Sequence, residues 1–357
     1  MKVFIIGVNG FIGNALARRI VRDTDSSVIG IDLEKTRLDT ELLNHPRFEF
    51  FHGDITVSRE WVEFQIKRCD VVIPLAAVAI PKIYIENPLL VFELDFLENL
   101  RIIQLVVKYG NFLIFPSTSE VYGMAQDTVF DEETTNFVLG PIHKHRWIYS
   151  CAKQLLDRVI HAYGLQRGLT YTIFRPFNWV GPGLDRMDEL KIGNSRVVTQ
   201  FISDIVFNRP IHLVGGGQQR RALLYLDDGI DGLLRIVLHH KDTAKNQIFN
   251  LGNPANEISM RKLAELLIEL YAKYPRAAQH PFTAGLRECT GEEYYGSGYQ
   301  DVTYRCPSIK KAKELLGWTP QHGLYDTLSM TMEWFLDNVQ QWEGTPRDKS
   351  VKVLHQS

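Results

Sequence analysis

The sequence has few cysteines and no long apolar segment. Its four cysteines, among 357 residues, lie far apart and include no CxxC pair, which excludes a disulfide framework and predicts reduced thiols. No segment approaches the roughly 20 continuous apolar residues of a membrane span, and the apolar run at residues 1–7 is too short for the core of a signal peptide. We therefore expect a cytoplasmic protein that makes no membrane contact.

Neither sign of charge dominates the sequence. The 40 Lys and Arg residues and the 42 Asp and Glu residues give a formal net charge of −2, so the broad basic surface of a nonspecific nucleic-acid binder is missing. The six tryptophans are too scattered to form a stacking platform for bases. The eleven histidines include no HExxH motif and no clustered ligand pattern. The sequence therefore predicts neither a nucleic-acid partner nor a metal site, and local groups must bind any anionic ligand.

Short apolar runs alternate with amphipathic segments in the first half of the chain. Buried strands are expected at residues 3–6, 28–31, 48–51, 71–75, 112–115 and 171–174. Between them, apolar residues have helical spacing over residues 13–22, 91–109 and 150–164. This alternation predicts an α/β fold with a doubly wound, parallel Rossmann sheet.

The pattern changes after about Pro176 to loops rich in glycine and proline, with isolated helices such as residues 260–271. We expect a Rossmann domain at residues 1–176, a smaller, loop-rich C-terminal substrate lobe at residues 177–341, and a fraying polar tail at residues 342–357. A helix at residues 227–238 and a strand at residues 247–251, within the segment near residues 225–255, are expected to return to the first domain.

A glycine-rich turn follows the first predicted strand and opens the first predicted helix. Residues 7–13 read GVNGFIG, which is a GxxGxxG spacing. Glycines at such a turn let the backbone approach a pyrophosphate, and the free N–H groups of the helix N-terminus bind the anion. The candidate cofactor contacts are Gly7, Asn9, Gly10, Phe11, Ile12 and Gly13. The alternative is a tight glycine turn without a ligand.

The second predicted strand ends at Asp32, 19 residues after the last glycine of this turn. This is close to the ~20 residues expected for the acid that binds an adenosine ribose. A carboxylate there accepts from both ribose hydroxyls and repels a 2′-phosphate, which favours NAD over NADP, although Lys35 and Arg37 nearby weaken that preference. Asp54 and Ile55, after the third predicted strand, are candidate adenine contacts. The alternative for Asp54 is an ordinary loop aspartate.

Tyr149 and Lys153 are candidate catalytic residues because they lie four positions apart, on one face of a predicted helix. An adjacent ammonium favours a phenolate and so lowers the pKa of a phenol, which is ~10 in isolation. Such a tyrosine can remove a hydroxyl proton while hydride leaves the same carbon. Residues 117–120, which read STSE, follow a predicted strand and are the expected partners. The alternative is a surface pair on a helix.

These patterns resemble the extended short-chain dehydrogenase/reductase family, whose members act on nucleotide sugars with a tightly bound NAD. Five segments extend the resemblance: SEVYG at residues 119–123, RWIYS at 146–150, RPFNW at 175–179, GGGQQRR at 215–221 and YQDV at 299–302. Together they are similar to the UDP-glucuronate decarboxylase (dehydrogenase) domains of bifunctional polymyxin-resistance proteins, without the formyltransferase domain. The similarity extends from Met1 to about Asn338. It implies NAD as cofactor and UDP-glucuronate as substrate. It also implies a homodimer formed by the helices at residues 91–109 and 150–164, unless these are covered within the monomer.

The resemblance implies that the tyrosine and lysine above oxidise the sugar at C4, with Thr118 or Ser119 hydrogen-bonded to the same hydroxyl. The oxidised sugar is a β-keto acid, and loss of CO2 places its electrons in the new carbonyl as an enolate. Glu120 matches the family's proton acceptor and Arg305 its proton donor. An arginine, with a pKa above ~12, is better suited to stabilise the anion than to donate a proton. The expected products are a UDP-4-keto-pentose (UDP-beta-L-threo-pentopyranos-4-ulose), CO2 and NADH.

The implied substrate carries two phosphates and a carboxylate, so a nearly neutral protein must concentrate cations at its site. The resemblance places these residues against the substrate: Ala79, Tyr84, Arg146, Asn178, Arg196, His212, Arg221 and Tyr299. Arg220 is a weaker candidate, because a solvated surface charge explains it equally well. His212 departs from the family pattern, in which a lysine is usual beside the uridine, so this contact is expected to vary with pH.

Other functions stay open at this point. A UDP-xylose synthase, or an enzyme that releases both products, uses the same residues and returns the hydride to C4. A 4-epimerase or a 4,6-dehydratase is more distant, since an epimerase needs no group such as Arg305 to manage decarboxylation, and a dehydratase commonly has aspartate before the glutamate at position 120. A dinucleotide-binding sensor that has lost the chemistry is the non-enzyme alternative, and the retained tyrosine, lysine and serine argue against it.

Overall fold

The computed structural model describes residues 1–185 and 195–339. Its larger part is built on a seven-stranded sheet of order β11-β6-β5-β4-β1-β2-β3, in which every neighbouring pair is parallel. These strands are β1 (Lys2–Ile6), β2 (Ser27–Asp32), β3 (Phe48–His52), β4 (Val71–Pro74), β5 (Phe112–Pro116), β6 (Thr170–Pro176) and β11 (Gln247–Leu251). The predicted α/β fold with a parallel Rossmann sheet is confirmed.

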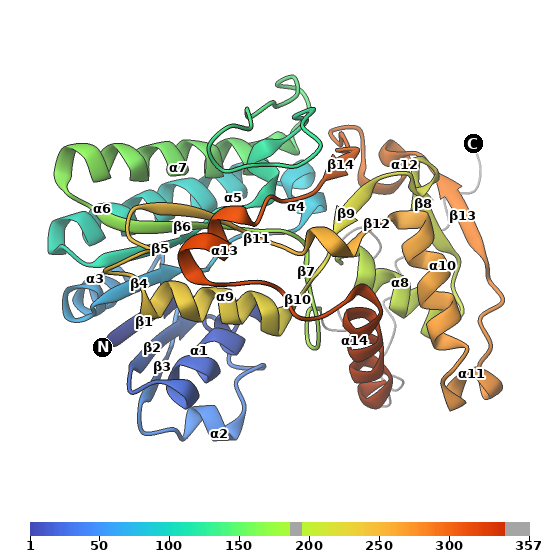
Figure 1. Cartoon of the computed structure of the whole chain (residues 1–357), viewed down its shortest axis with the longest axis horizontal. Coiled ribbons are helices and arrows are strands. Elements are labelled where there is room, and N and C mark those ends of the chain that lie inside the picture. Colours follow the sequence, from blue (N-terminus) through green and yellow to red (C-terminus); the bar gives the residue numbers. More distant parts are fainter. Residues whose placement is uncertain (186–194, 340–357) are drawn as a thin grey trace.

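Helices cover both faces of this sheet (Figure 1). One face packs against α1 (Phe11–Asp23), α9 (Leu226–Leu238) and α13 (Lys310–Leu316). The other packs against α3 (Arg59–Arg68), α6 (Asn99–Tyr109) and α7 (Trp147–Arg167). The central strands β4 and β5 are buried at every position, as expected of a parallel sheet covered on both sides. Edge strand β11 pairs with β6, so a segment from late in the chain completes the sheet.

A second group of elements lies beside the carboxyl ends of the sheet strands, at the right of Figure 1. It contains α8 (Val197–Val206), β8 (Ile211–Val214), β9 (Arg220–Ala222), β12 (Glu257–Ser259), α10 (Met260–Tyr271), α11 (Pro275–Gln279), β13 (Leu286–Cys289), α12 (Gly291–Tyr295), β14 (Tyr304–Arg305) and α14 (Leu324–Asn338). These elements have their own apolar core, centred on α8, α10 and α14. The tail predicted at residues 342–357 lies outside the described residues.

The helix predicted over residues 91–109 differs from the structure. The chain forms α4 (Pro81–Glu86) and α5 (Pro88–Val91), then a π-helix, η1 (Phe92–Glu98), before α6 begins. Within η1, Asp95 and Glu98 are buried, and the Asp95 carboxylate accepts from the Val78 N–H at 3.0 Å. A π-helix adds a residue to the turn. The apolar spacing could not reveal this widening. The π-helix accompanies the contact of Asp95 with Val78, 17 positions earlier in the chain.

Two features are absent from the described part of the chain. It contains no helix long and apolar enough to cross a membrane. It also contains no group of three or more His, Cys, Asp or Glu residues placed to hold a metal ion. The absence of membrane contact and of a metal from the whole protein stays a prediction.

Candidate active site

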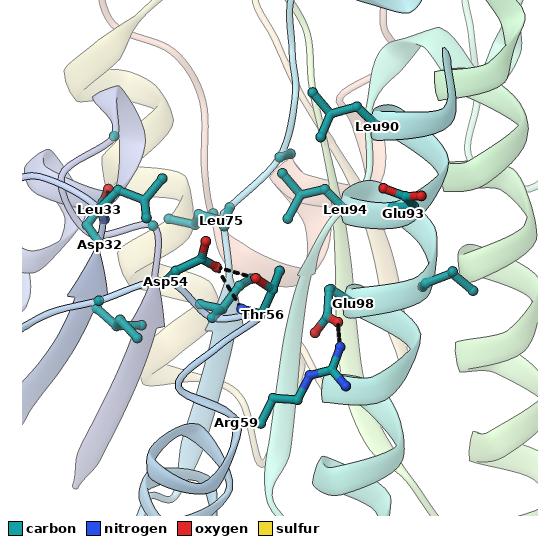
Figure 2. Close-up of a pocket in the computed structure, with 18 residues that line it drawn as sticks. Asp32, Leu33, Asp54, Thr56, Arg59, Leu75, Leu90, Glu93, Leu94 and Glu98 are labelled. Carbon is teal, nitrogen blue, oxygen red and sulfur yellow. Dashed lines mark hydrogen bonds and ion pairs between the residues drawn. The ribbon is translucent and has the colours of Figure 1, made fainter. Parts of the chain in front are cut away.

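A cavity of about 750 Å³ lies at the carboxyl ends of the central strands (Figure 2). This is where open α/β sheets bind ligands, and where the sequence predicts a dinucleotide. The cavity walls are the glycine turn, the ends of β2 and β4, the loop after β3, and η1. Its lining residues are Gly7, Gly10, Ile31, Asp32, Leu33, Gly53, Asp54, Ile55, Thr56, Arg59, Leu75, Ala76, Ala77, Leu90, Glu93, Leu94, Leu97 and Glu98.

The three glycines of the turn have different structural roles. Gly7 has a φ of 85°, and a Cβ there would lie 2.7 Å from the backbone nitrogen of Ala76. A Cβ on Gly13 would collide with the carbonyl oxygen of Gly7, so this glycine lets α1 pack against the turn. Gly7 and Gly10 line the cavity, whereas Gly13 does not. The turn therefore combines backbone exposed to the cavity with packing that a side chain would disrupt.

The side chains of Asn9, Phe11 and Ile12 are not among the cavity lining. The Asn9 amide donates to Thr36 Oγ1 at 3.3 Å and accepts from the Arg37 N–H at 2.8 Å, which fixes the loop after β2. Phe11 and Ile12 pack against the apolar core. The predicted cofactor contacts of these three residues stay predictions.

Asp32 lies at the end of β2 with its carboxylate held in place. One oxygen accepts from the Asn9 N–H and the other from the Leu33 N–H, each at 2.8 Å. Burial raises the pKa of Asp32, although these N–H groups act against the shift. The carboxylate lines the cavity, so its position fits the predicted ribose-binding acid.

Asp54 follows β3, on the same side of the cavity as Asp32, and Glu98 lies across the cavity in η1 (Figure 2). Asp54 accepts from the N–H and the hydroxyl of Thr56, both at 2.7 Å, so it stabilises its own loop as well as lining the cavity. Glu98 pairs with Arg59 at 2.5 Å and with Arg101 at 2.8 Å. The sequence analysis missed the Glu98–Arg59 pair, because no local signal joins residues 39 positions apart.

Tyr149 and Lys153 lie together in the first turns of α7. Their exposed fractions are 7% and 1%, so they are not the surface pair considered as the alternative. Lys153 Nζ donates to the Pro116 carbonyl at 3.0 Å and lies 5.9 Å from the centroid of the Tyr149 ring. Tyr84 is buried and stacks on that ring with centroids 4.8 Å apart, so it supports Tyr149; its predicted substrate contact stays a prediction.

Burial dominates the electrostatics of this pair. Burial raises the pKa of Tyr149 well above its usual range, and the carboxylates of Asp95 and Glu120 raise it further. Burial also lowers the pKa of Lys153, against the effects of Asp95 and Asp157. In both cases the largest cause is desolvation, which disfavours the charged form. That the Lys153 ammonium favours the phenolate of Tyr149 stays a prediction.

A smaller cavity of about 170 Å³ lies between η2 (Ser119–Tyr122), the start of α7 and the second group of elements. The predicted residues that line it are Glu120, Arg146, Asn178, His212, Arg221, Tyr299 and Arg305. Residues that the sequence analysis did not assign here include Gln200, Gln219, Tyr295 and Asp301. Asp301 lay within a motif of the resemblance, but no property of the sequence gave it a role.

Guanidinium and carboxylate groups alternate in this cavity. Glu120 pairs with Arg146 at 2.9 Å and with Arg305 at 3.5 Å. Arg221 pairs with Asp301 at 3.0 Å. Arg305 Nη1 is also 3.5 Å from Ser119 Oγ, which connects the charged groups to the segment predicted to be catalytic. These three arginines exceed the two carboxylates, so the cluster favours an anionic ligand.

Burial and neighbouring charges shift the pKa values of the cluster. Burial acts to raise the pKa of Glu120, but Arg146 and Arg305 outweigh it and the pKa is lowered. Burial lowers the pKa of Arg305 to about 10; Glu120 opposes this shift, whereas Arg221 and Arg146 add to it. Glu120 is therefore held as a carboxylate, and Arg305 gives up a proton more readily than an ordinary arginine.

Several candidate residues line neither cavity: Thr118, Ser119, Tyr149 and Lys153 among the candidate catalytic residues, and Ala79, Tyr84, Arg196 and Arg220 among the candidate substrate contacts. Arg196 forms an ion pair with Asp185, and its side chain is 42% exposed. Arg220 pairs with Glu257, which supports the interpretation of this residue as a surface charge. Ala79 lies between residues 77 and 81, which line the first and the second cavity respectively. The structure therefore does not bring the Arg196 and Arg220 side chains to the charged cluster.

His212 and Asn178 both line the second cavity. Burial lowers the pKa of His212, and Arg287 lowers it further, so the ring is neutral at pH 7. Asn178 has a φ of 41° and donates from its amide to the Ala222 carbonyl at 3.2 Å. The imidazole of His212 lies 6.0 Å from the ring of Tyr294, centroid to centroid.

The fold and the two cavities define a Rossmann protein with a buried tyrosine–lysine pair. Residues 3–252 match the NAD dependent epimerase/dehydratase family. This match covers more than half of the chain, and the protein belongs to that family of enzymes. NAD is its cofactor.

Solved structures resemble the chain over almost its whole length. The PbgP3 protein from Burkholderia pseudomallei is 47% identical, with 96% of this chain and 98% of that chain covered and a TM-score of 0.86. The UDP-glucose 4-epimerase from Thermotoga maritima, solved with UDP-glucose, is 24% identical, with coverage of 95% and 100% and a TM-score of 0.78. The UDP-glucuronic acid 4-epimerase from Bacillus cereus, solved with UDP-glucuronic acid and NAD, is 22% identical, with coverage of 94% and 99% and a TM-score of 0.77. At these low identities the two epimerases show the fold alone.

Proposed function

We propose that this protein is an NAD-dependent UDP-glucuronate decarboxylase (dehydrogenating) that releases a UDP-4-keto-pentose, CO2 and NADH. The observation that carries the proposal is the buried contact of Glu120 with Arg146 and Arg305, beside Ser119, in a cavity. This cluster provides the guanidinium groups of Arg146 and Arg305 to bind a sugar carboxylate. Arg305 can also stabilise the negative charge that forms when CO2 leaves. The Bacillus cereus epimerase of the same fold was solved with UDP-glucuronic acid and NAD, which supports the choice of ligands.

The residues of the first cavity fit NAD. Gly7 and Gly10 expose backbone to the space where a pyrophosphate would lie, and the oriented carboxylate of Asp32 can accept from the hydroxyls of a ribose. When bound, NAD supplies the hydride acceptor and the positive charge of its nicotinamide ring. That charge favours the phenolate form of Tyr149, which burial alone disfavours.

Tyr149 is the proposed base for oxidation at C4. Thr118 and Ser119 lie at the start of η2, and either is the proposed group that holds the sugar hydroxyl within reach of the phenolate. Lys153, fixed by the Pro116 carbonyl, stabilises the phenolate. The C4 hydroxyl gives its proton to Tyr149, and the hydride from the same carbon reduces the cofactor.

Arg305 and Glu120 are the proposed groups for decarboxylation. The C5–carboxylate bond breaks, CO2 leaves, and the electron pair enters the C4 carbonyl as an enolate. The Arg305 guanidinium stabilises this negative charge, and the lowering of its pKa to about 10 by burial makes proton donation to C5 less unfavourable. The proton lost from the C4 hydroxyl balances the one gained at C5, so the products are the ketone, CO2 and NADH.

The test is to incubate purified protein with NAD and UDP-glucuronate labelled in the carboxyl group. We expect equal amounts of labelled CO2 and NADH, and a product mass that corresponds to the UDP-4-keto-pentose. UDP-xylose formed without net NADH would replace the proposal with a UDP-xylose synthase. No CO2 release would indicate an epimerase or a dehydratase instead.

Replacing Asp32 by alanine is expected to relax the preference for NAD over NADP by about tenfold or more, which corresponds to ~1.4 kcal/mol. The substitution removes the charge that would repel a 2′-phosphate. The measurement is the ratio of kcat/KM for the two cofactors, with Asp54→Ala, in the loop after β3, as the comparison. An unaltered ratio would mean that another group distinguishes the ribose.

We also propose a homodimer formed by η1, α6 and α7. Large apolar side chains of this region are exposed, among them Phe92, Leu97 and Leu155 at 39%, 44% and 49%. Burial of such side chains against a second copy would be favourable. Sedimentation should give the mass of a dimer for the wild type and a shift towards monomer for Leu155→Glu. A wild-type monomer at micromolar concentration would contradict this arrangement.

A further inference from the structure

One buried ion pair is bonded to both ends of the segment at residues 117–122. At the start of the segment, Ser117 Oγ donates to Asp157 Oδ2 at 2.9 Å. At its end, Arg175 Nη1 donates to the Tyr122 hydroxyl at 2.8 Å. Asp157 and Arg175 pair with each other at 3.0 Å. The four residues are at most 4% exposed, and they come from β5–η2, α7 and β6.

We propose that Asp157 and Arg175 are positioning residues that hold Ser119 and Glu120 in place for the reaction. The inference rests on the proposed function, since it assigns those two residues a catalytic part. Neither Asp157 nor Arg175 lines either of the two cavities described above, so they act through Ser117 and Tyr122 rather than on the substrate.

The bonding of this pair is incomplete, which favours a positioning role over a purely stabilising one. Taking two charges out of water is costly, and apolar residues of similar size often stabilise a fold equally well. Within residues 1–185 and 195–339, Asp157 Oδ1 and Arg175 Nε have no hydrogen-bond partner. The bonds that the pair does make go to the two ends of one short segment, as expected if the geometry of that segment matters most.

The same contacts extend to two further parts of the enzyme. The Tyr122 hydroxyl donates to Asn250 Oδ1 at 2.8 Å, and Asn250 Nδ2 donates to the Phe130 carbonyl at 3.0 Å. This joins η2 to edge strand β11. Asp157 also lies one turn after Lys153 in α7, where its charge favours the protonated amine. One carboxylate therefore influences both the serine–glutamate segment and the lysine.

The test uses Ser117→Ala, which removes the hydrogen bond to Asp157, and Tyr122→Phe, which removes the bonds to Arg175 and Asn250. Asp157→Asn removes the charge. We expect kcat to fall by about 10- to 100-fold in each, since a misplaced reacting group costs about this much, with KM and NAD affinity unchanged. The matched control is Tyr171→Phe, which removes another buried hydroxyl from β6. That hydroxyl bonds to His161 Nδ1 at 3.0 Å and not to the ion pair. If Asp157→Asn does not fold, the two hydroxyl variants still decide the question.

Hydrogen–deuterium exchange provides a readout that needs no substrate. Amides of residues 117–123 should exchange faster in Ser117→Ala and Tyr122→Phe than in the wild type and in Tyr171→Phe. Wild-type kcat and exchange in both hydroxyl variants would overturn the positioning inference. If the wild type releases no CO2 from UDP-glucuronate, the proposed function fails, whereas the exchange comparison still decides the positioning inference by itself.

Discussion

The substitution Tyr149→Phe should reduce kcat by about 10²- to 10⁴-fold, the usual contribution of a general base, while NAD binding is retained. The reason is that the variant keeps the ring stacked on Tyr84 but loses the oxygen that accepts the C4 proton. The measurement is single-turnover formation of NADH from UDP-glucuronate, together with NAD affinity by calorimetry. Tyr109→Phe is a suitable control, because it removes a hydroxyl that bonds to Glu63 at 2.6 Å on the surface.

The pH dependence of the same step gives a second check. Burial raises the pKa of Tyr149, and the active form is the phenolate, so the rate of hydride transfer should increase with pH. The apparent pKa should be lower in the NAD-bound enzyme than that of the tyrosine in the free protein, because the nicotinamide charge favours the phenolate. A rate of hydride transfer that is independent of pH, or that persists in Tyr149→Phe, would remove Tyr149 as the base.

The second large effect is expected from Arg305→Ala, which should slow CO2 release by about 10²- to 10³-fold, the usual cost of losing a group that stabilises a developing anion. Oxidation at C4 should be affected less, because Arg305 contacts Glu120 and Ser119 rather than Tyr149. The two steps are separated by following NADH and labelled CO2 in the same experiment.

The control for Arg305 is Arg220→Ala. Arg220 belongs to the same small sheet, but it pairs with Glu257 and is not among the residues that line the cavity. Thermal unfolding of both variants shows whether either loses its fold. CO2 release at the wild-type rate in a folded Arg305→Ala protein would show that this arginine takes no part in decarboxylation.

The sheet and the glycine turn could be predicted because their signals are local. A buried parallel strand is a short apolar run, and the turn before α1 has a fixed glycine spacing. The pairing of Tyr149 with Lys153 was predictable for the same reason, since four positions along a helix bring two side chains to one face. In each case the residues that cause the structure lie within a few positions of one another.

The electrostatics of the site could not be predicted in this way. The pKa of Tyr149 depends on burial and on Asp95, a residue of the π-helix more than 50 positions earlier. The Arg221–Asp301 pair joins residues 80 positions apart. Arg196 shows the converse, because the resemblance implied a substrate contact while the structure pairs this residue with Asp185. Such contacts depend on how separate elements pack against one another in the folded chain.

The position of Glu120 between two guanidinium groups has a consequence for turnover. In the proposed reaction, an entering sugar acid would compete with Glu120 for Arg146 and Arg305. The departing CO2 would carry no charge, and the remaining sugar ring would have lost its carboxylate. Once the carboxyl group is gone, Glu120 again has both cations to itself, and the attraction that drew the acid in no longer retains what is left of it. In the proposed reaction, the Glu120 carboxylate would therefore pair with Arg146 and Arg305 again after each turnover, so that no anion from the solvent is needed to restore the free site.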